Sequence, residues 1–207
     1  MKEQEPIVFV IDDDALIRSG MESLLRSIGL RTAAYSSAAE FMSAKHSDRP
    51  ACLVLDVRMP GQSGLDLQRE LAGAGVSIPI IFITGHADIP MTVRAMKDGA
   101  MEFLTKPVRS QELIDAVQKA IARDRELHKQ QADLAAIQTR FNSLTPRETQ
   151  VLHLVVAGLL NKQIADELGM SELTVKTHRA HVMEKTGADS LAQLARMFER
   201  LRGPAQK

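Results

Sequence analysis

The sequence predicts two folded regions: a doubly wound α/β domain with five parallel strands, followed by a smaller domain made only of helices. Three observations support this division. Short apolar segments alternate five times with segments of helical spacing between residues 5 and 122. Residues 123–142 then form a polar stretch without proline or glycine. Residues 143–201 contain repeated helix-start signals and no strand pattern.

Composition narrows the class of protein. The 207 residues carry no net charge, so attraction to nucleic acid or membrane has to come from a local patch. The single cysteine, Cys52, excludes a disulfide framework and fits a reducing compartment. No apolar run approaches the roughly 18 residues of a membrane span, and the first residues are polar, unlike a signal peptide. We therefore expect a cytoplasmic protein without membrane contact.

The first predicted strand is Ile7–Ile11, which is apolar and largely β-branched. It stops at Asp12, and Asp13 and Asp14 follow. Apolar residues then recur at helical spacing over Ala15–Ile28, so a helix is expected there with Asp14 as its N-cap.

The central strand is the continuous apolar run from Cys52 to Leu55, which ends at Asp56. Such a run is typical of a strand buried on both faces, and a Pro-Gly turn follows it closely. The remaining strands are expected at Arg31–Tyr35, Ile78–Thr84 and Glu102–Leu104, and the remaining helices after Ser37, at Gly64–Ala72, at Asp88–Asp98 and at Ser110–Ile121.

Polar side chains stand at or just after four of these strands. They are Asp12, Asp13, Asp56, Thr84 and Lys106. Parallel strands place their C-terminal ends on one edge of the sheet, where ligands bind in open α/β folds. Clustered carboxylates suit Mg²⁺, and a carboxylate beside that ion can attack a phosphoryl donor. A hydroxyl and an ammonium would then stabilise the phosphoryl oxygens. The plainer alternative is a salt-bridged rim in which Lys106 pairs with an Asp and Thr84 caps a helix.

With these residues in place, residues 5–122 resemble a response-regulator receiver domain, which has a flavodoxin-like fold. The resemblance implies that Asp56 is the phosphoacceptor, and that Asp13, Asp56 and the Arg58 carbonyl hold Mg²⁺ with Asp12 acting through water. It implies a cis peptide before Pro107. It also implies that Thr84 and Phe103 form the switch, Phe103 standing where many relatives have tyrosine.

The polar stretch at residues 123–142 is expected to be a helical linker. Leu127, Leu134 and Phe141 repeat every seven residues, as in a short coiled-coil seam, although Gln130 interrupts the pattern. An amphipathic helix packed on its own domain explains the same spacing equally well.

The all-helical region begins with a capping box in which Thr145 and Glu148 flank Pro146. Asn161 and Ser171 are expected to cap the second and third helices, the third running to about Thr186. Ser190 and Gln193 are expected to form another capping box, which opens a fourth helix. Short helices joined by a Gly-containing turn are typical of a helix-turn-helix, whose second helix enters the major groove. A helical bundle with a charged solvated face is the alternative.

Residues 143–201 resemble a LuxR-type helix-turn-helix in its four-helix form. With the receiver, the chain resembles a NarL/FixJ-type regulator, and residues 84–91 look like the FixJ branch. The resemblance implies that Lys176, Thr177 and Arg179 enter the groove. It implies that Asn161, Lys162 and Thr174 lie nearer the phosphates.

The expected function is that of a two-component response regulator rather than an enzyme. A sensor histidine kinase would phosphorylate Asp56 with Mg²⁺. Phosphorylation would promote homodimerisation and promoter binding, with RNA polymerase as a further partner and activation as the expected output. One helix-turn-helix gives a small interface, so tight binding to double-stranded DNA should need a dimer on a two-fold site.

Three other classes of protein are alternatives to this function. Haloacid-dehalogenase-type hydrolases typically carry a second Asp two residues after the nucleophile, where this chain has Arg58. A P-loop switch needs the G-x-x-x-x-G-K-[ST] pattern, which the sequence lacks. A regulator driven by a partner protein instead of phosphate is the third alternative, and no residue in the sequence favours it.

Overall fold

A computed structural model describes residues 5–46, 48–85 and 88–202 of the chain. The chain divides into two compact units, Met1–His128 and Lys129–Lys207. Within the described residues, no helix has both the length and the apolar character needed to cross a membrane. Residues 86 and 87, which belong to the FixJ-like stretch, lie outside the described residues.

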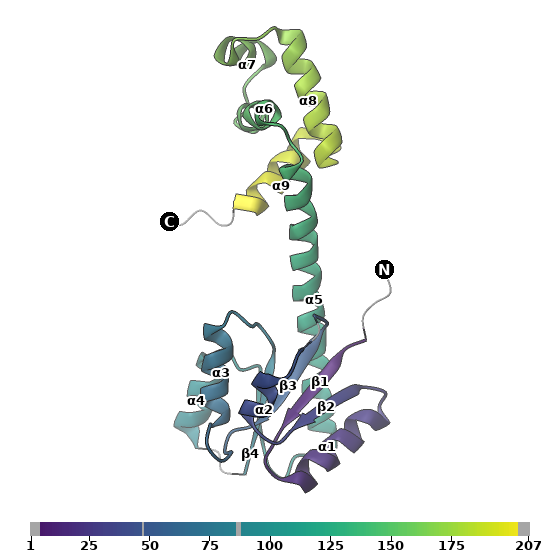
Figure 1. Cartoon of the computed structure of the whole chain (residues 1–207), viewed down its shortest axis with the longest axis vertical. Helices are drawn as coiled ribbons and strands as arrows, with labels where there is room; N and C mark the ends of the chain where they lie inside the picture. Colours follow the sequence, from purple (N-terminus) through teal and green to yellow (C-terminus); the bar gives the residue numbers. More distant parts are fainter. Residues whose placement is uncertain (1–4, 47, 86–87, 203–207) are drawn as a thin grey trace. The chain divides into compact units, whose positions relative to one another are not determined.

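The first unit (Figure 1) contains a five-stranded, all-parallel sheet, and its strand order is β2-β1-β3-β4-β5. This confirms the predicted doubly wound fold. The strands are β1 (Ile7–Ile11), β2 (Arg31–Tyr35), β3 (Ala51–Asp56), β4 (Ile80–Thr84) and β5 (Glu102–Thr105). β3 is the middle strand, and all six of its residues are buried.

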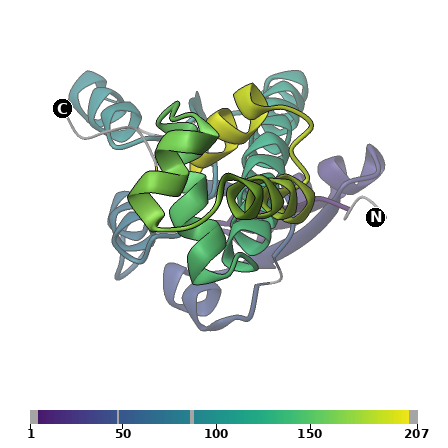
Figure 2. The ribbon, with the colours of Figure 1, turned by 90° about the horizontal axis from the view of Figure 1, so that it is seen from above.

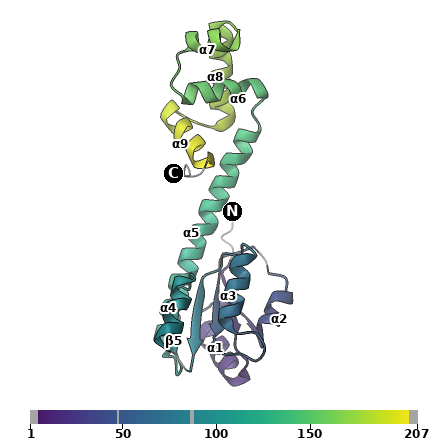
Figure 3. The ribbon, with the colours of Figure 1, turned by 90° about the vertical axis from the view of Figure 1, so that its left-hand side faces the viewer.

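Helices cover both faces of this sheet (Figures 1 and 3). Met21 and Leu25 of α1 and Val117 of α5 pack on one face. Phe41 of α2 and Leu67 of α3 pack on the other, where α4 joins them. The helices are α1 (Ala15–Ser27), α2 (Ala38–Ser43), α3 (Gly64–Gly73), α4 (Ile89–Lys97) and α5 (Ser110–Asn142). Asp14 caps α1 as predicted, accepting from the backbone N–H groups of residues 16 and 17.

Gly64, the first residue of α3, packs directly on the end of β3. A Cβ atom built there would lie 2.3 Å from the carbonyl oxygen of Asp56. The Gly64 N–H donates to the carbonyl of Val57 at 3.0 Å. Only glycine therefore lets α3 begin this close to Asp56.

After α5, the described residues of the second unit form four helices, as the sequence predicted. These helices cross one another (Figure 2). They are α6 (Pro146–Val156), α7 (Asn161–Leu168), α8 (Glu172–Thr186) and α9 (Leu191–Arg202). Their core includes Val151, Ile164, Val182 and Leu194, together with Phe141 from the last turn of α5. Ile137 of α5 is buried in the same core, so the C-terminal end of the predicted linker packs on the helices of the second unit.

Two expected caps differ in the structure. Leu160 rather than Asn161 is the N-cap of α7, and the Leu160 N–H donates to Gln163 Oε1 at 2.8 Å. Asn161 is drawn instead into a contact with α8. Ser190 Oγ accepts from the Gln193 N–H at 3.2 Å, but Gln193 Oε1 accepts from the Asp189 N–H at 2.8 Å and not from the Ser190 N–H. The predicted capping box is thus only half formed.

Candidate metal centre and candidate nucleic-acid interface

The strand register brings two carboxylates together at the C-terminal edge of the sheet. Ile11, the last residue of β1, pairs with Leu55 of β3. The residues that follow this pair, Asp12 and Asp56, are therefore side by side at the ends of the two strands. Both carboxylates are buried, with exposures of 1% and 6%. The polar residues predicted to share this edge do share it.

Lys106, which follows β5, joins the two carboxylates. Its Nζ donates to Asp12 Oδ2 at 2.7 Å and to Asp56 Oδ2 at 2.6 Å. The Lys106 N–H donates to the Thr84 carbonyl at 2.8 Å, which ties the lysine to the end of β4. The peptide bond between Lys106 and Pro107 is cis, as the resemblance implied.

The electrostatics of this pocket oppose the negative charge on Asp12. Burial raises the pKa of Asp12, the nearby Asp56 adds to that effect, and the hydrogen bond from Lys106 only partly offsets it. Burial alone would lower the pKa of Lys106, but its bonds to Asp12 and Asp56 raise it overall. The pocket therefore holds more negative charge than one lysine balances.

The same pocket offers a set of oxygen ligands. Carboxylate oxygens of Asp12, Asp13 and Asp56 all lie within 4.8 Å of one another. Asp13 is exposed while the other two are buried, so the cluster opens to solvent on one side. The Arg58 N–H donates to Asp56 Oδ1 at 3.1 Å, which fixes the orientation of that carboxylate. Hard oxygen donors and uncompensated charge fit a divalent cation such as Mg²⁺.

The two predicted switch residues are on the neighbouring strands β4 and β5. Thr84 ends β4 and is fully buried. Phe103 pairs in register with Phe82, and their ring centroids are 6.1 Å apart. The Phe103 side chain is half-buried against the core that α2, α3 and α4 cover.

The second unit presents a helix-turn-helix formed by α7 and α8. Gly169 ends α7 with a positive φ of 64°, and Ser171 caps α8 by accepting from the Thr174 N–H at 3.1 Å. Val175 and Val182 face the core. The opposite side of α8 is a stripe of exposed residues spaced three or four apart, consisting of Leu173, Lys176, Thr177, Ala180 and Glu184.

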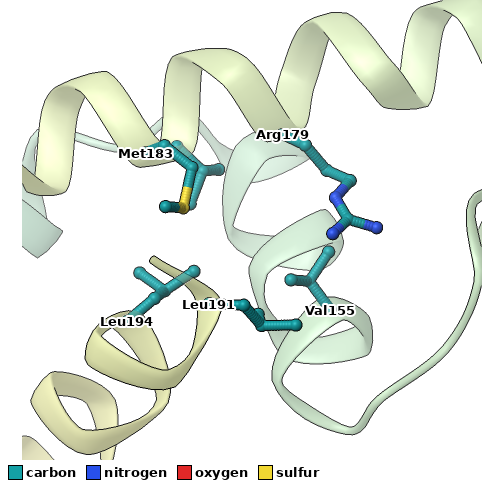
Figure 4. Close-up of a pocket in the computed structure, with 6 residues that line it drawn as sticks. Val155, Arg179, Met183, Leu191 and Leu194 are labelled. Carbon is teal, nitrogen blue, oxygen red and sulfur yellow. The ribbon is translucent and has the colours of Figure 1, made fainter. Parts of the chain in front are cut away.

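Arg179, one of the predicted groove residues, contacts α7 in this structure. Its Nη1 donates to Asn161 Oδ1 at 2.6 Å. The side chain also lines an apolar cavity of about 140 Å³ between α6, α8 and α9, beside Val155 and Leu191 (Figure 4). Lys176 and Thr177 lie on the exposed stripe, whereas Arg179 joins the two helices of the motif. Sequence spacing alone did not indicate this contact.

An ion pair between a buried carboxylate and a partly exposed lysine joins α8 to the start of α6. Glu148, 3% exposed, accepts from Lys185 Nζ at 2.7 Å and from the Thr145 N–H at 2.8 Å. The bond from Lys185 and the capping bonds from Thr145 lower the pKa of Glu148 to about 2. The sequence predicted the capping box but not the lysine, because the two residues are 37 positions apart.

A receiver-type acidic pocket and a helix-turn-helix in one chain define a DNA-binding regulator. Family models agree. The response regulator receiver domain matches residues 8–118, and the LuxR family of bacterial regulatory proteins matches residues 142–198. This chain belongs to the NarL/FixJ family of two-component response regulators. It is therefore a two-component transcriptional regulator and not an enzyme.

Individual relatives span nearly the whole chain. Nodulation protein W of Bradyrhizobium diazoefficiens is 55% identical over 94% of this chain and 86% of its own length. The transcriptional regulatory protein FixJ of Azorhizobium caulinodans is 44% identical over 95% of this chain and 93% of its own. The solved structure of the response regulator StyR matches with a TM-score of 0.88 and 47% identity, covering 95% of this chain and 100% of that one.

Proposed function

We propose that phosphorylation of Asp56 by a sensor histidine kinase controls promoter binding by this regulator. The observation that carries the proposal is the position of Lys106 Nζ, which lies 2.7 Å from Asp12 and 2.6 Å from Asp56 inside the carboxylate cluster. This one ammonium group contacts two buried carboxylates, so it is placed to contact a third anionic group that enters the pocket. A phosphoryl group bonded to Asp56 is such a group.

In the proposed reaction, an oxygen of the Asp56 carboxylate attacks the phosphorus of a phosphohistidine. The P–O bond forms as the P–N bond breaks, and the electron pair returns to the imidazole nitrogen of the kinase. The Arg58 N–H orients the attacking carboxylate, and Lys106 supplies positive charge to the phosphoryl oxygens. Mg²⁺, held by Asp13, Asp56 and the Arg58 carbonyl with Asp12 acting through water, would neutralise further charge there.

Phosphorylation would reach the surface through Thr84 and Phe103. A phosphoryl oxygen that draws the Thr84 hydroxyl inward leaves room for the Phe103 ring, which is only half-buried. That movement alters the surface formed by α4, β5 and the start of α5. α4 exposes three apolar side chains, Ile89, Val93 and Met96, which supports its use as a dimer interface.

The dimer would then bind two half-sites of a promoter. Lys176 and Thr177 belong to the exposed stripe of α8 and are proposed to read base edges. Asn161, Lys162 and Thr174 are proposed to lie nearer the phosphates, with Arg179 holding Asn161 in place between helices. Recruitment of RNA polymerase would make the protein an activator that works in the cytoplasm.

The test is DNA binding by the full chain, using a fragment selected from random sequence. Affinity is measured with Mg²⁺, with and without a small phosphodonor, for wild type and Asp56→Asn. Size-exclusion chromatography of the same samples reports the oligomeric state. We expect the donor to tighten binding and produce a dimer in wild type only.

Equal binding by both proteins with and without the donor would refute the proposal. That result would still support DNA binding by the helix-turn-helix, but a partner protein would replace phosphorylation as the signal. An unchanged monomer in both states would refute the dimer step separately.

A further inference from the structure

Three potential metal ligands meet between α6 and α8, remote in sequence from the acidic pocket. They are Glu148 in the first turn of α6 and the two histidines His178 and His181 of α8. One carboxylate oxygen and one nitrogen of each ring lie within 4.8 Å of one another. Because the histidines are three residues apart, both are on one face of α8. The same pair spacing places metal ligands on a single helix in other bundles.

The hydrogen bonds of this cluster leave ligand atoms open. Glu148 Oε2 accepts from both Lys185 and Thr145. Glu148 Oε1 faces His181 Nδ1 at 3.6 Å, which is too long for a hydrogen bond. His178 Nδ1 is buried and has no hydrogen-bond partner among the described residues. Leaving a buried imidazole nitrogen without a partner is costly, so each such group in a native structure needs an explanation.

The chemistry of the three ligands selects the kind of ion. Two imidazoles and one carboxylate suit Zn²⁺ and Co²⁺, with water in the fourth position, whereas Mg²⁺ and Ca²⁺ prefer oxygen ligands alone. We propose that Glu148, His178 and His181 form a transition-metal site that joins the start of α6 to the DNA-binding helix. This site is separate from the receiver pocket and does not depend on Asp56.

The surroundings allow the site to close. Bonds to zinc of about 2.0–2.2 Å require the ligand atoms to move closer together than they are now. His181 has a half-exposed side chain and is free to rotate toward Glu148 Oε1. The Lys185 ammonium opposes a cation, but it contacts only Oε2, and its partly exposed side chain reaches solvent without disturbing the core. Thr177 and Arg179 flank His178, so a bound ion would restrain the residues next to DNA.

The experiment titrates Co²⁺, as a spectroscopic probe, into the full chain with excess Mg²⁺ to fill the receiver pocket. We expect one equivalent of Co²⁺ to give the intense visible absorption of a four-coordinate site with nitrogen ligands. Zn²⁺ should displace it. His181→Gln should abolish the band, and because His181 is half-exposed this variant should fold. His178→Gln gives a second test, with circular dichroism to confirm folding.

Two variants serve as matched controls. His153→Gln removes an exposed histidine of α6 outside the cluster and should leave the band unchanged. Asp56→Asn removes an oxygen ligand of the receiver pocket and should also leave it unchanged. The proposal fails if wild type gives no such band, if His181→Gln keeps it, or if Asp56→Asn removes it. Zn²⁺ should also raise the melting temperature of wild type more than that of His181→Gln.

Discussion

Each unit of this protein buries a carboxylate against a lysine, and the two pairs have opposite electrostatics. Asp12 accepts from Lys106, yet its pKa is raised, because burial and the neighbouring Asp56 outweigh the lysine. Glu148 accepts from Lys185, and its pKa is lowered to about 2, because capping bonds add to that of the lysine. Burial therefore disfavours the charged carboxylate in the first pair, whereas hydrogen bonds favour it in the second.

The largest expected effect separates the two lysines. Lys106→Met should slow phosphorylation of Asp56 by about 100-fold, because the phosphoryl group in transfer loses its stabilising cation. Most of the gain in DNA affinity that the phosphodonor produces should be lost as a result. Lys185→Met is the matched control in the second unit. It should lower stability but preserve the ratio of affinities with and without donor. Phosphorylation is followed by gel mobility, and a Lys106→Met protein that responds normally to the donor would break the contrast.

The next effect concerns stability of the second unit. Glu148→Ala should cost about 2 kcal/mol, because the hydrogen bonds from Lys185 and from the Thr145 N–H are lost, although Lys185 can still reach solvent. Glu148→Gln should cost less, since the amide oxygen still accepts from Thr145. The only tyrosine, Tyr35, is in the receiver, and the chain has no tryptophan. The circular dichroism transition of Glu148→Ala should therefore shift while the Tyr35 fluorescence transition does not.

The pH dependence of the same pair has a definite sign. The folded pKa of Glu148, about 2, lies below its ordinary value of 4.5. Its stabilisation is thus fully present above that ordinary value and is lost as the pH falls from there toward about 2. The difference in unfolding free energy between wild type and Glu148→Gln should shrink over that interval. A difference that stays constant down to the lower limit would show that the carboxylate charge is irrelevant.

The smallest effect has the opposite direction. Because the pKa of Asp12 is raised, its ionised form destabilises the folded receiver near neutral pH. Asp12→Asn should therefore raise the melting temperature by a few degrees in EDTA, and Mg²⁺ should stabilise it less than wild type. Tyr35 fluorescence reports both results. Asp115→Asn, on the exposed side of α5, should change neither, and a less stable Asp12→Asn protein would contradict the comparison.

The fold was predictable because local patterns and tertiary structure agree in it. Apolar runs became buried parallel strands, and parallel strands necessarily carry the polar residues after them to one edge. The pocket could therefore be assembled from strand ends at Asp12, Asp56 and Lys106. The helix-turn-helix was predictable from caps and glycines for the same reason, since these signals act within a few residues.

What escaped prediction depends on partners distant in sequence. Asn161 is a residue type that often caps helices, but its side chain accepts a hydrogen bond from Arg179 of α8. Leu160 is the N-cap of α7 instead. Asp124 was placed in a linker, yet it is buried and accepts from the Ala51 N–H at 2.7 Å, at the start of the central strand. It follows Val117 and Ala120 at helical spacing, so the buried stripe of α5 could have indicated it.

The central strand also determines how the protein can be studied chemically. Cys52 is fully buried in β3, and burial raises the pKa of its thiol to about 12. It is the only cysteine in the chain. Cys52 should therefore not react with thiol reagents in the folded protein. A single cysteine introduced on the surface could then be labelled specifically with a fluorophore or a spin label. The slow rate at which Cys52 itself is labelled would measure how often the receiver core opens.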